Sequence, residues 1–295
     1  MLLTEKMKED IFSPSEKAII AYLFKERENI KDKTTKEISK VTYTHPSHLI
    51  RIAKKLGFNG WLELKESFLA EIEYLNSHFT SIDANFPFEE RDSIMSIVNK
   101  LAILSQTTIS DTLSLLNNED LQKAANLLNK AKHIKIFSSY HNLLLCHAFK
   151  VKMKRIRKHV SLINVDPHFE ALNSNSETCA VVISYSGENE HIINVMPFLV
   201  RKKVPIIVLT SIGENTLTKY ADSILRITTR ERLYSKIDSF STNESISFLL
   251  NVLYACLFSM DYKNNLEYKI HAAQYYDYRK SSNKVMQEEE HDNME

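Results

Sequence analysis

Short apolar runs alternate with helical stretches along the second half of the chain, and this alternation is the strongest constraint on its fold. Many of the residues in these runs are β-branched. The runs are His133–Phe137, Val160–Ile163, Cys179–Ser184, Val204–Thr210 and Ser223–Thr228. Apolar strands spaced by helices are typical of a parallel sheet with helical crossovers. The sequence therefore predicts an α/β domain in which helices flank a five-stranded parallel sheet.

Before residue 130 every patterned segment has helical periodicity. Ser13-Pro14-Ser15-Glu16 combines an N-cap, a proline at the first helical position and a capping-box glutamate. Such signals predict helices at about 14–27, 35–41, 46–56 and 60–75, and a long helical segment at about 89–116. The chain of 295 residues is long for one domain. We expect an all-α domain at 1–77, a linker and connecting helices at 78–125, the α/β domain at 126–262, and an extension at 263–295 with a disordered acidic end.

Composition excludes several classes of protein. The net charge is only +1, so a signal for nucleic acid has to be local. Cys146, Cys179 and Cys256 stand far apart, which argues against a disulfide framework or a zinc site. No apolar run approaches the roughly 20 residues that span a bilayer. We expect a soluble, cytoplasmic chain without metal or cofactor.

A local basic segment coincides with a helix-turn-helix pattern. Residues 36–55 hold five cations and one acid, in helices at 35–41 and 46–56 that are joined by Thr42–His45. One face of the second helix is apolar, and the other carries Ser47, His48, Arg51, Lys54 and Lys55. A recognition helix needs this division, because one side packs on its domain while the other enters the major groove. A solvated amphipathic helix would show the same pattern.

Position along that helix suggests individual roles. Ser47, His48 and Arg51 lie near its start, where base edges are within reach, and Arg51 has the geometry to bind guanine bidentately. Lys54 and Lys55 are better placed for phosphate.

The stretch Ser13–Leu75 resembles the N-terminal domain of the RpiR/MurR family of bacterial transcription regulators. The resemblance rests on Ser13–Lys17, Lys36–Ser39 and above all Arg51–Trp61, which joins the recognition helix, the stop at Gly57 and the aromatic start of the next helix. It implies a regulator that binds double-stranded DNA. The family usually caps the recognition helix with a small polar residue, whereas here His45 stands before Pro46 and Thr44 is the alternative cap.

A second motif, Ile183–Asn189, follows an apolar strand and precedes a helical stretch at His191–Val200. Hydroxyls and free backbone N–H groups at a strand-to-helix turn can hold an anion. Ser184, Ser186 and Asn189 are spaced to surround a phosphate, and Gly187 permits the tight turn. Hydroxyls that only cap the helix would look similar.

Residues 126–262 resemble a sugar isomerase (SIS) domain with a flavodoxin-type sheet. The match includes His133–Phe137, Ser184–Asn189, Leu217–Asp222 and Lys236–Thr242. It implies that a phosphorylated sugar binds through Ser184, Ser186, Asn189 and the backbone N–H of Tyr185. The family's first loop is glycine-rich and then carries a serine; here it reads Ser138-Ser139-Tyr140, so Ser139 is one of two candidates for that serine.

Together these features predict a homodimeric or homotetrameric regulator that senses a phosphosugar and is not an enzyme. Two alternatives remain. One is a sugar-phosphate isomerase or lyase with an accessory helical domain, for which Glu244 is the acid expected near the last helix. The other is a regulator whose SIS domain only dimerises.

Overall fold

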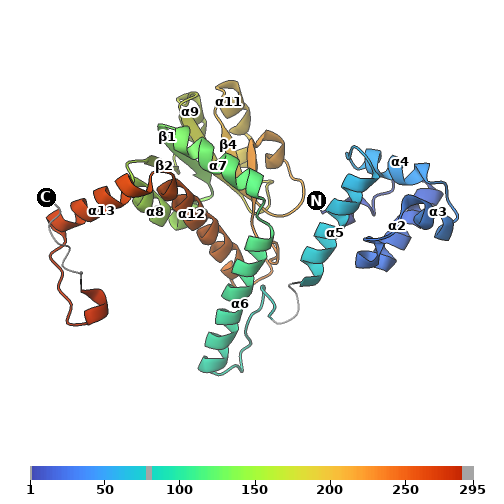
Figure 1. Cartoon of the computed structure of the whole chain (residues 1–295), viewed down its shortest axis with the longest axis horizontal. Coiled ribbons are helices and arrows are strands. Elements are labelled where there is room, and N and C mark those ends of the chain that lie inside the picture. Colours follow the sequence, from blue (N-terminus) through green and yellow to red (C-terminus); the bar gives the residue numbers. More distant parts are fainter. Residues whose placement is uncertain (1, 78–81, 288–295) are drawn as a thin grey trace.

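The computed structural model describes residues 2–77 and 82–287. Its helical domain consists of α1 (Leu3–Lys6), α2 (Pro14–Glu26), a 3₁₀ turn (Arg27–Ile30), α3 (Thr35–Val41), α4 (Ser47–Lys55) and α5 (Trp61–Ser77), drawn in blue to cyan in Figure 1. The predicted capping box at Ser13 is formed, and Thr34 and Glu37 form a second one at the start of α3. The helix predicted at about 60–75 is confirmed as α5, and its Trp61, Leu64 and Phe68 lie in the domain's core.

The α/β domain contains one sheet with the strand order β2-β1-β3-β4-β5, and all four pairings are parallel. The strands are β1 (His133–Ser138), β2 (His159–Ile163), β3 (Thr178–Ile183), β4 (Ile206–Thr210) and β5 (Ser223–Arg226). Every residue of β3 and β4 is buried. Helices on both faces explain why these strands read as continuous apolar runs. The strand order is that of flavodoxin-type folds.

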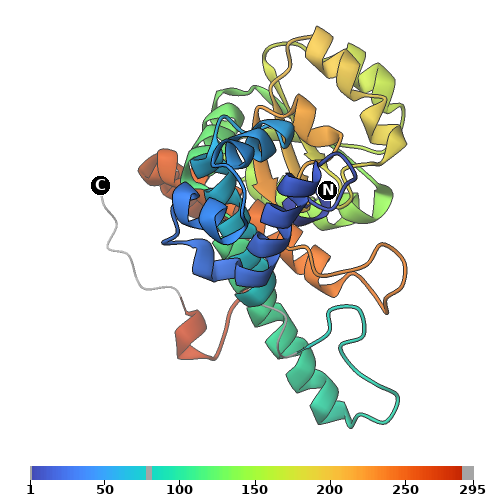
Figure 2. The ribbon, with the colours of Figure 1, turned by 90° about the vertical axis from the view of Figure 1, so that its right-hand side faces the viewer.

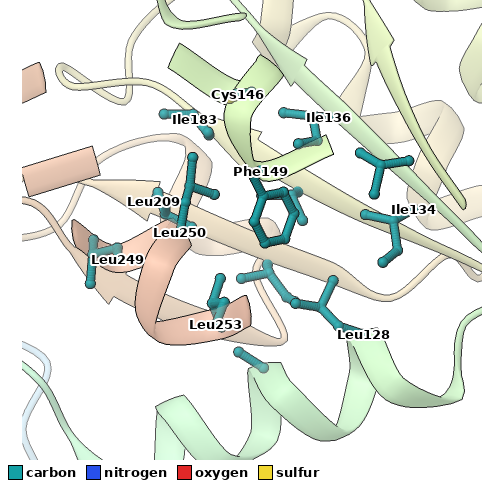
Figure 3. Packing of buried hydrophobic residues seen from close by; sticks show 14 of the residues in the cluster. Leu128, Ile134, Ile136, Cys146, Phe149, Ile183, Leu209, Leu249, Leu250 and Leu253 are labelled. Carbon is teal, nitrogen blue, oxygen red and sulfur yellow. The ribbon is translucent and has the colours of Figure 1, made fainter. Parts of the chain in front are cut away.

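Two helical layers enclose the sheet. One face packs against α7 (Asn118–Lys130), α8 (Tyr140–Lys154) and α12 (Phe240–Met260), and Figure 3 shows Leu128, Phe149 and Leu253 from these helices meeting over it. The opposite face packs against α9 (Pro167–Leu172), α10 (Glu190–Ile193), α11 (Met196–Arg201) and the 3₁₀ turn Leu217–Tyr220. The carboxyl ends of the strands therefore lie at one edge of the sheet, between the two helical layers.

Two helices extend beyond this core. α6 (Ile94–Ser114) packs its C-terminal half on α12, where the Thr112 and Ser245 hydroxyls are 2.8 Å apart, while its N-terminal half projects outward in both views (Figures 1 and 2). α13 (Tyr262–Tyr276) bends away from the end of α12, and a short 3₁₀ turn follows at Lys284–Met286.

Several predicted boundaries were wrong. α6 starts at Ile94 rather than near residue 89, because Ser93 caps it and residues 82–93 form a loop. The helical stretch at His191–Val200 is two short helices, α10 and α11, with Pro197 in the first turn of the second. α13 was not predicted at all. The expected disorder of the acidic end falls partly on residues 288–295, which lie outside the described residues.

Among the described residues, no single helix is long and apolar enough to cross a membrane. The bent pair α12–α13 passes that test only when its two helices are taken together, and the core side of α12 is buried against the sheet.

Candidate functional site

α4 divides its side chains as a recognition helix does. Leu49, Ile52 and Ala53 are fully buried against the domain, while Arg51 and Lys54 are exposed. Ser47 and His48 are half-buried at the start of the helix. The helix ends as predicted, since Gly57 has a φ of 90° and the N–H of Phe58 donates to the carbonyl of Ala53.

His45 serves as the cap of α4. The N–H of Ser47 donates to Nδ1 of His45 over 3.3 Å, and the Ser47 hydroxyl lies 2.9 Å from the same nitrogen. The hydroxyl of Thr44 is instead paired with that of Thr42, so the alternative cap is not used. An imidazole nitrogen here replaces the hydroxyl that the family usually supplies.

The ammonium group of Lys55 is bonded to other residues of the helical domain. Its Nζ donates to a carboxylate oxygen of Glu16 over 2.7 Å and to the carbonyl of Ile11 over 2.9 Å. The Glu16 side chain is only 3% exposed. Burial opposes ionisation of Glu16, but hydrogen bonds from Lys55 and Ser13 outweigh it and keep the pKa of Glu16 below its usual value. This ion pair ties α4 to α2.

The turn before α4 has an unusual backbone. Tyr43 has a φ of 53°, in the left-handed region, and its side chain is 97% exposed. A non-glycine residue there costs roughly 1 kcal/mol.

The serine-rich loop, residues 184–189, leaves the carboxyl end of β3. The N–H of Ser184 extends the pairing to Leu209, and the Ser186 hydroxyl accepts the N–H of Glu188 over 3.2 Å. Gly187 has a φ of 67°, and a Cβ added there would lie 2.0 Å from Cγ of Asn215. Only glycine fits this turn.

The loop after β1 lies beside this serine-rich loop, because Ser138 is in register with Ile183. The hydroxyl of Ser138 donates to the carbonyl of Ile183 over 2.5 Å and accepts from Asn142 over 3.0 Å. Ser139 is exposed at the start of α8, and within the described residues its hydroxyl makes no capping bond. Two loops at a reversal of strand order form the crevice where open α/β sheets bind ligands.

Asn189 and Tyr185 are the remaining residues of the serine-rich loop that were predicted to bind the ligand. The side-chain oxygen of Asn189 is buried, and no hydrogen-bond partner for it exists among the residues described. The Tyr185 hydroxyl donates to the carbonyl of Glu231 over 2.7 Å and accepts its N–H over 3.1 Å. The aromatic ring therefore points toward the loop between β5 and α12 instead of into the crevice.

A pocket of about 230 Å³ lies next to the crevice, between the carboxyl ends of β1 and β2, the first turn of α8, and the helices α9 and α10. Ser138, Asn164 and His191 supply its polar lining, and apolar residues such as Phe137 and Ile192 supply the rest. The serine-rich loop does not line it.

Glu231 is the acid that sequence reasoning missed. Its carboxylate accepts the N–H of Ser241 over 2.6 Å and the hydroxyl of Thr242 over 2.7 Å, and it pairs with Lys236 over 2.9 Å. It thus caps α12 from ten residues upstream, and its side chain is fully buried. Glu244, the acid expected in this region, is half-buried within the first turns of α12.

No group of three or more histidine, cysteine or acidic residues able to hold a metal ion occurs in the part of the chain that the structure describes. Burial raises the pKa of the Cys146 and Cys179 thiols to about 12, which leaves both protonated and unreactive near neutrality.

Both domains match known families. A model of the rpiR-family helix-turn-helix domain matches residues 1–74, and a model of the SIS domain matches residues 127–255. The chain belongs to the RpiR family of transcription regulators. This RpiR-family chain binds DNA through its helix-turn-helix domain, and a SIS domain follows that domain along the chain.

Full-length relatives agree with this assignment. A helix-turn-helix transcriptional regulator of Caldanaerobacter subterraneus is 23% identical, over 92% of this chain and 95% of its own. One from Clostridium perfringens is 27% identical, over 87% and 91%. Among solved structures, Vibrio vulnificus NanR in complex with ManNAc-6P has a TM-score of 0.56 at 16% identity and covers 92% of this chain and 97% of NanR. That likeness supports the fold.

Proposed function

We propose that this regulator reads its operator with the exposed face of α4 and senses a phosphorylated sugar at the serine-rich loop. For the DNA interface, the observation that carries the proposal is the burial pattern of α4. Arg51 and Lys54 are exposed on the side opposite the buried Ile52 and Ala53. Ser47 and His48 sit at the end of the helix that enters a groove first.

Arg51 is assigned to a base edge and Lys54 to phosphate. Arg51→Ala should weaken binding to a DNA fragment selected by the full chain from a random pool by about 1–3 kcal/mol, and weaken binding to unrelated DNA much less. The matched control is Arg201→Ala, which removes an exposed arginine at the end of α11. Equal losses on selected and unrelated DNA would remove Arg51 from base recognition.

Lys55, which the sequence places with the phosphate-binding residues, is assigned a structural role. Its ammonium group is already bonded to Glu16 and to the carbonyl of Ile11. A phosphate contact would have to break an ion pair with a carboxylate that is almost fully buried.

For the ligand, the observation that carries the proposal is the position of the serine-rich loop beside the first loop, at the reversal of strand order. Ser139, Ser184, Ser186 and Asn189 would surround the phosphate. Between the two candidate serines of the first loop we choose Ser139, because the hydroxyl of Ser138 already has both a donor and an acceptor. NanR, which this chain resembles in fold over nearly its whole length, is described in complex with ManNAc-6P.

The ligand assignment is tested by thermal shift with ManNAc-6P, other hexose phosphates and inorganic phosphate. A ligand at 100 times its Kd adds about 2.7 kcal/mol to the free energy of unfolding. Ser186→Ala should abolish the shift, and Ser110→Ala, an exposed serine on α6, should preserve it. If no compound of the panel stabilises the chain, the ligand assignment fails, and the alternative of a SIS domain that only dimerises is favoured.

We also propose that the chain is not an enzyme. Glu231, the buried acid that caps α12, is committed to that helix and to Lys236 and is unavailable for proton transfer. A turnover assay over the same sugar phosphates tests this, and consumption of any of them at a useful rate would favour the isomerase alternative.

A homodimer is proposed to bind two operator half-sites. The projecting half of α6 carries Ile94, Met95 and Val98, which are all exposed, and α6 leads directly into the SIS domain. Light scattering of the full chain and of a Val98→Glu variant tests this arrangement. A dimer unaffected by the charge would place the interface elsewhere.

A further inference from the structure

The segment just before α6 is anchored to the loop between β5 and α12. Asn85 is almost fully buried, and its side-chain oxygen accepts the N–H of Arg232 over 2.7 Å. Its carbonyl accepts the N–H of Ile237 over 2.8 Å, and its amide nitrogen donates to Asp83 over 2.9 Å. A buried amide bonded through its backbone and side chain holds a loop in one conformation.

The same stretch of the β5–α12 loop is held by the serine-rich loop. Tyr185 bonds to both the N–H and the carbonyl of Glu231. The peptide of residues 230–232 therefore lies between Tyr185 on one side and Asn85 on the other. Tyr185 stands between Ser184 and Ser186, which supply two of the hydroxyls proposed to meet the phosphate.

Contacts of Glu231 and Arg230 limit how far the backbone of residues 230–232 can move. The Glu231 carboxylate fixes it to the N-terminus of α12. The Arg230 guanidinium, which is nearly fully buried, donates to the Thr107 hydroxyl of α6 over 3.0 Å and to the carbonyl of Ile82 over 3.1 Å. A shift of residues 230–232 must therefore reach both α6 and the segment that follows the helix-turn-helix domain.

We propose that residues 230–232 couple the ligand loop to the DNA-binding domain, with Tyr185 and Asn85 as its two positioning residues. Binding of a phosphate by Ser184 and Ser186 shifts the intervening residue, and the Tyr185 hydroxyl carries that shift to the backbone that Asn85 holds. The ligand changes DNA affinity to the extent that it favours one of two arrangements of this contact. The response to ligand rests on the proposed function, whereas the mechanical contact does not.

The contact is tested first without ligand. Tyr185→Phe removes only the hydroxyl, and Tyr234→Phe removes the hydroxyl of a tyrosine in the same loop that is 92% exposed. In the full chain, Tyr185→Phe should speed hydrogen exchange of the peptides that contain residues 82–88 and 230–238 by about 3- to 10-fold, the loss of one or two hydrogen bonds. Tyr234→Phe should leave both unchanged. If hydrogen exchange near Asn85 is unchanged in Tyr185→Phe, the proposal is overturned, regardless of which ligand the chain binds.

The response is tested second, with ManNAc-6P and inorganic phosphate as probes and the selected DNA fragment as the reporter. Asn85→Ala, which lies outside the ligand loop, should bind the probe within about threefold of the wild-type Kd, yet lose most of the probe's effect on DNA affinity. Tyr185→Phe should lose that effect as well. A full response in either variant overturns the coupling. If no probe stabilises the wild-type chain, the sensing function fails, and the exchange experiment still decides whether Tyr185 and Asn85 are mechanically linked.

Discussion

Replacing Lys55 by methionine separates the structural and DNA-binding roles of the two adjacent lysines. The variant keeps the aliphatic stem and removes the ammonium group that pairs with Glu16. Breaking a fully buried pair costs about 3–5 kcal/mol, whereas an exposed pair contributes less than about 1 kcal/mol. The Lys55 side chain is 39% exposed and Glu16 keeps its bond from the N–H of Ser13, so we expect a loss of about 1–2 kcal/mol.

The chain provides a selective assay. Trp61 is the single tryptophan, and it lies in the core of the helical domain. Its fluorescence during urea unfolding therefore reports the free energy of unfolding of that domain within the full chain. Lys54→Met is the matched control, because Lys54 is exposed on the same helix and its loss should change stability by less than about 0.5 kcal/mol. Equal losses in the two variants would refute the assignment.

Acid pH provides an independent check. The folded pKa of Glu16 lies below the usual 4.5, so the ion pair adds stability above pH 4.5 and loses it as the pH falls through the lowered value. The stability difference between wild type and Lys55→Met should be complete at pH 7 and should shrink below pH 4.5. A difference that persists unchanged well below the folded pKa would mean that Glu16 is not its source.

Three further substitutions test local geometry. Gly187→Ala places a Cβ against Asn215 at a positive φ and should destabilise the SIS domain by about 3 kcal/mol in calorimetry, with partial rescue by Asn215→Ala. Tyr43→Gly should raise the stability of the helical domain by up to about 1 kcal/mol, measured by Trp61 fluorescence, since it relieves the left-handed backbone; a loss of stability would contradict backbone strain at Tyr43. His45→Ala should cost about 1 kcal/mol by the same measurement while His45→Ser is nearly neutral, and equal losses would contradict capping by Nδ1.

The sequence was sufficient for the elements whose signals are local. The capping box at Ser13, the helix stop at Gly57 and all five strands were predicted from residues that lie close together in the sequence. α10 and α11 were merged in the prediction because the break at Pro197 falls within an apolar stretch of helical periodicity. α13 was missed because its sequence is polar on average and its apolar residues are spread around the helix, which leaves only a weak apolar face.

Long-range pairings escaped prediction for a different reason. Glu16 lies 39 residues from Lys55, and Tyr185 lies 46 residues from Glu231. Periodicity correctly placed Lys55 on the polar side of α4, but it does not indicate that α2 presents a buried carboxylate there. The same limitation hid Glu231, since it precedes α12 by a loop instead of standing at its cap position.

The ion pair between Lys55 and Glu16 also affects how the DNA affinity should depend on salt. Phosphate binding releases about 0.9 counterions for each cation. Lys36 and Lys40 of α3 are both exposed in the same basic segment as Lys54. If these three lysines bind phosphate, a dimer should show a slope of log K against log salt of about −5, whereas a fourth cation per subunit would bring it to about −7. Lys54→Met should then reduce the steepness by nearly 2 per dimer, and Lys55→Met should leave it unchanged. A slope that falls equally in both variants would return Lys55 to the DNA interface and assign its ion pair with Glu16 to the free protein alone.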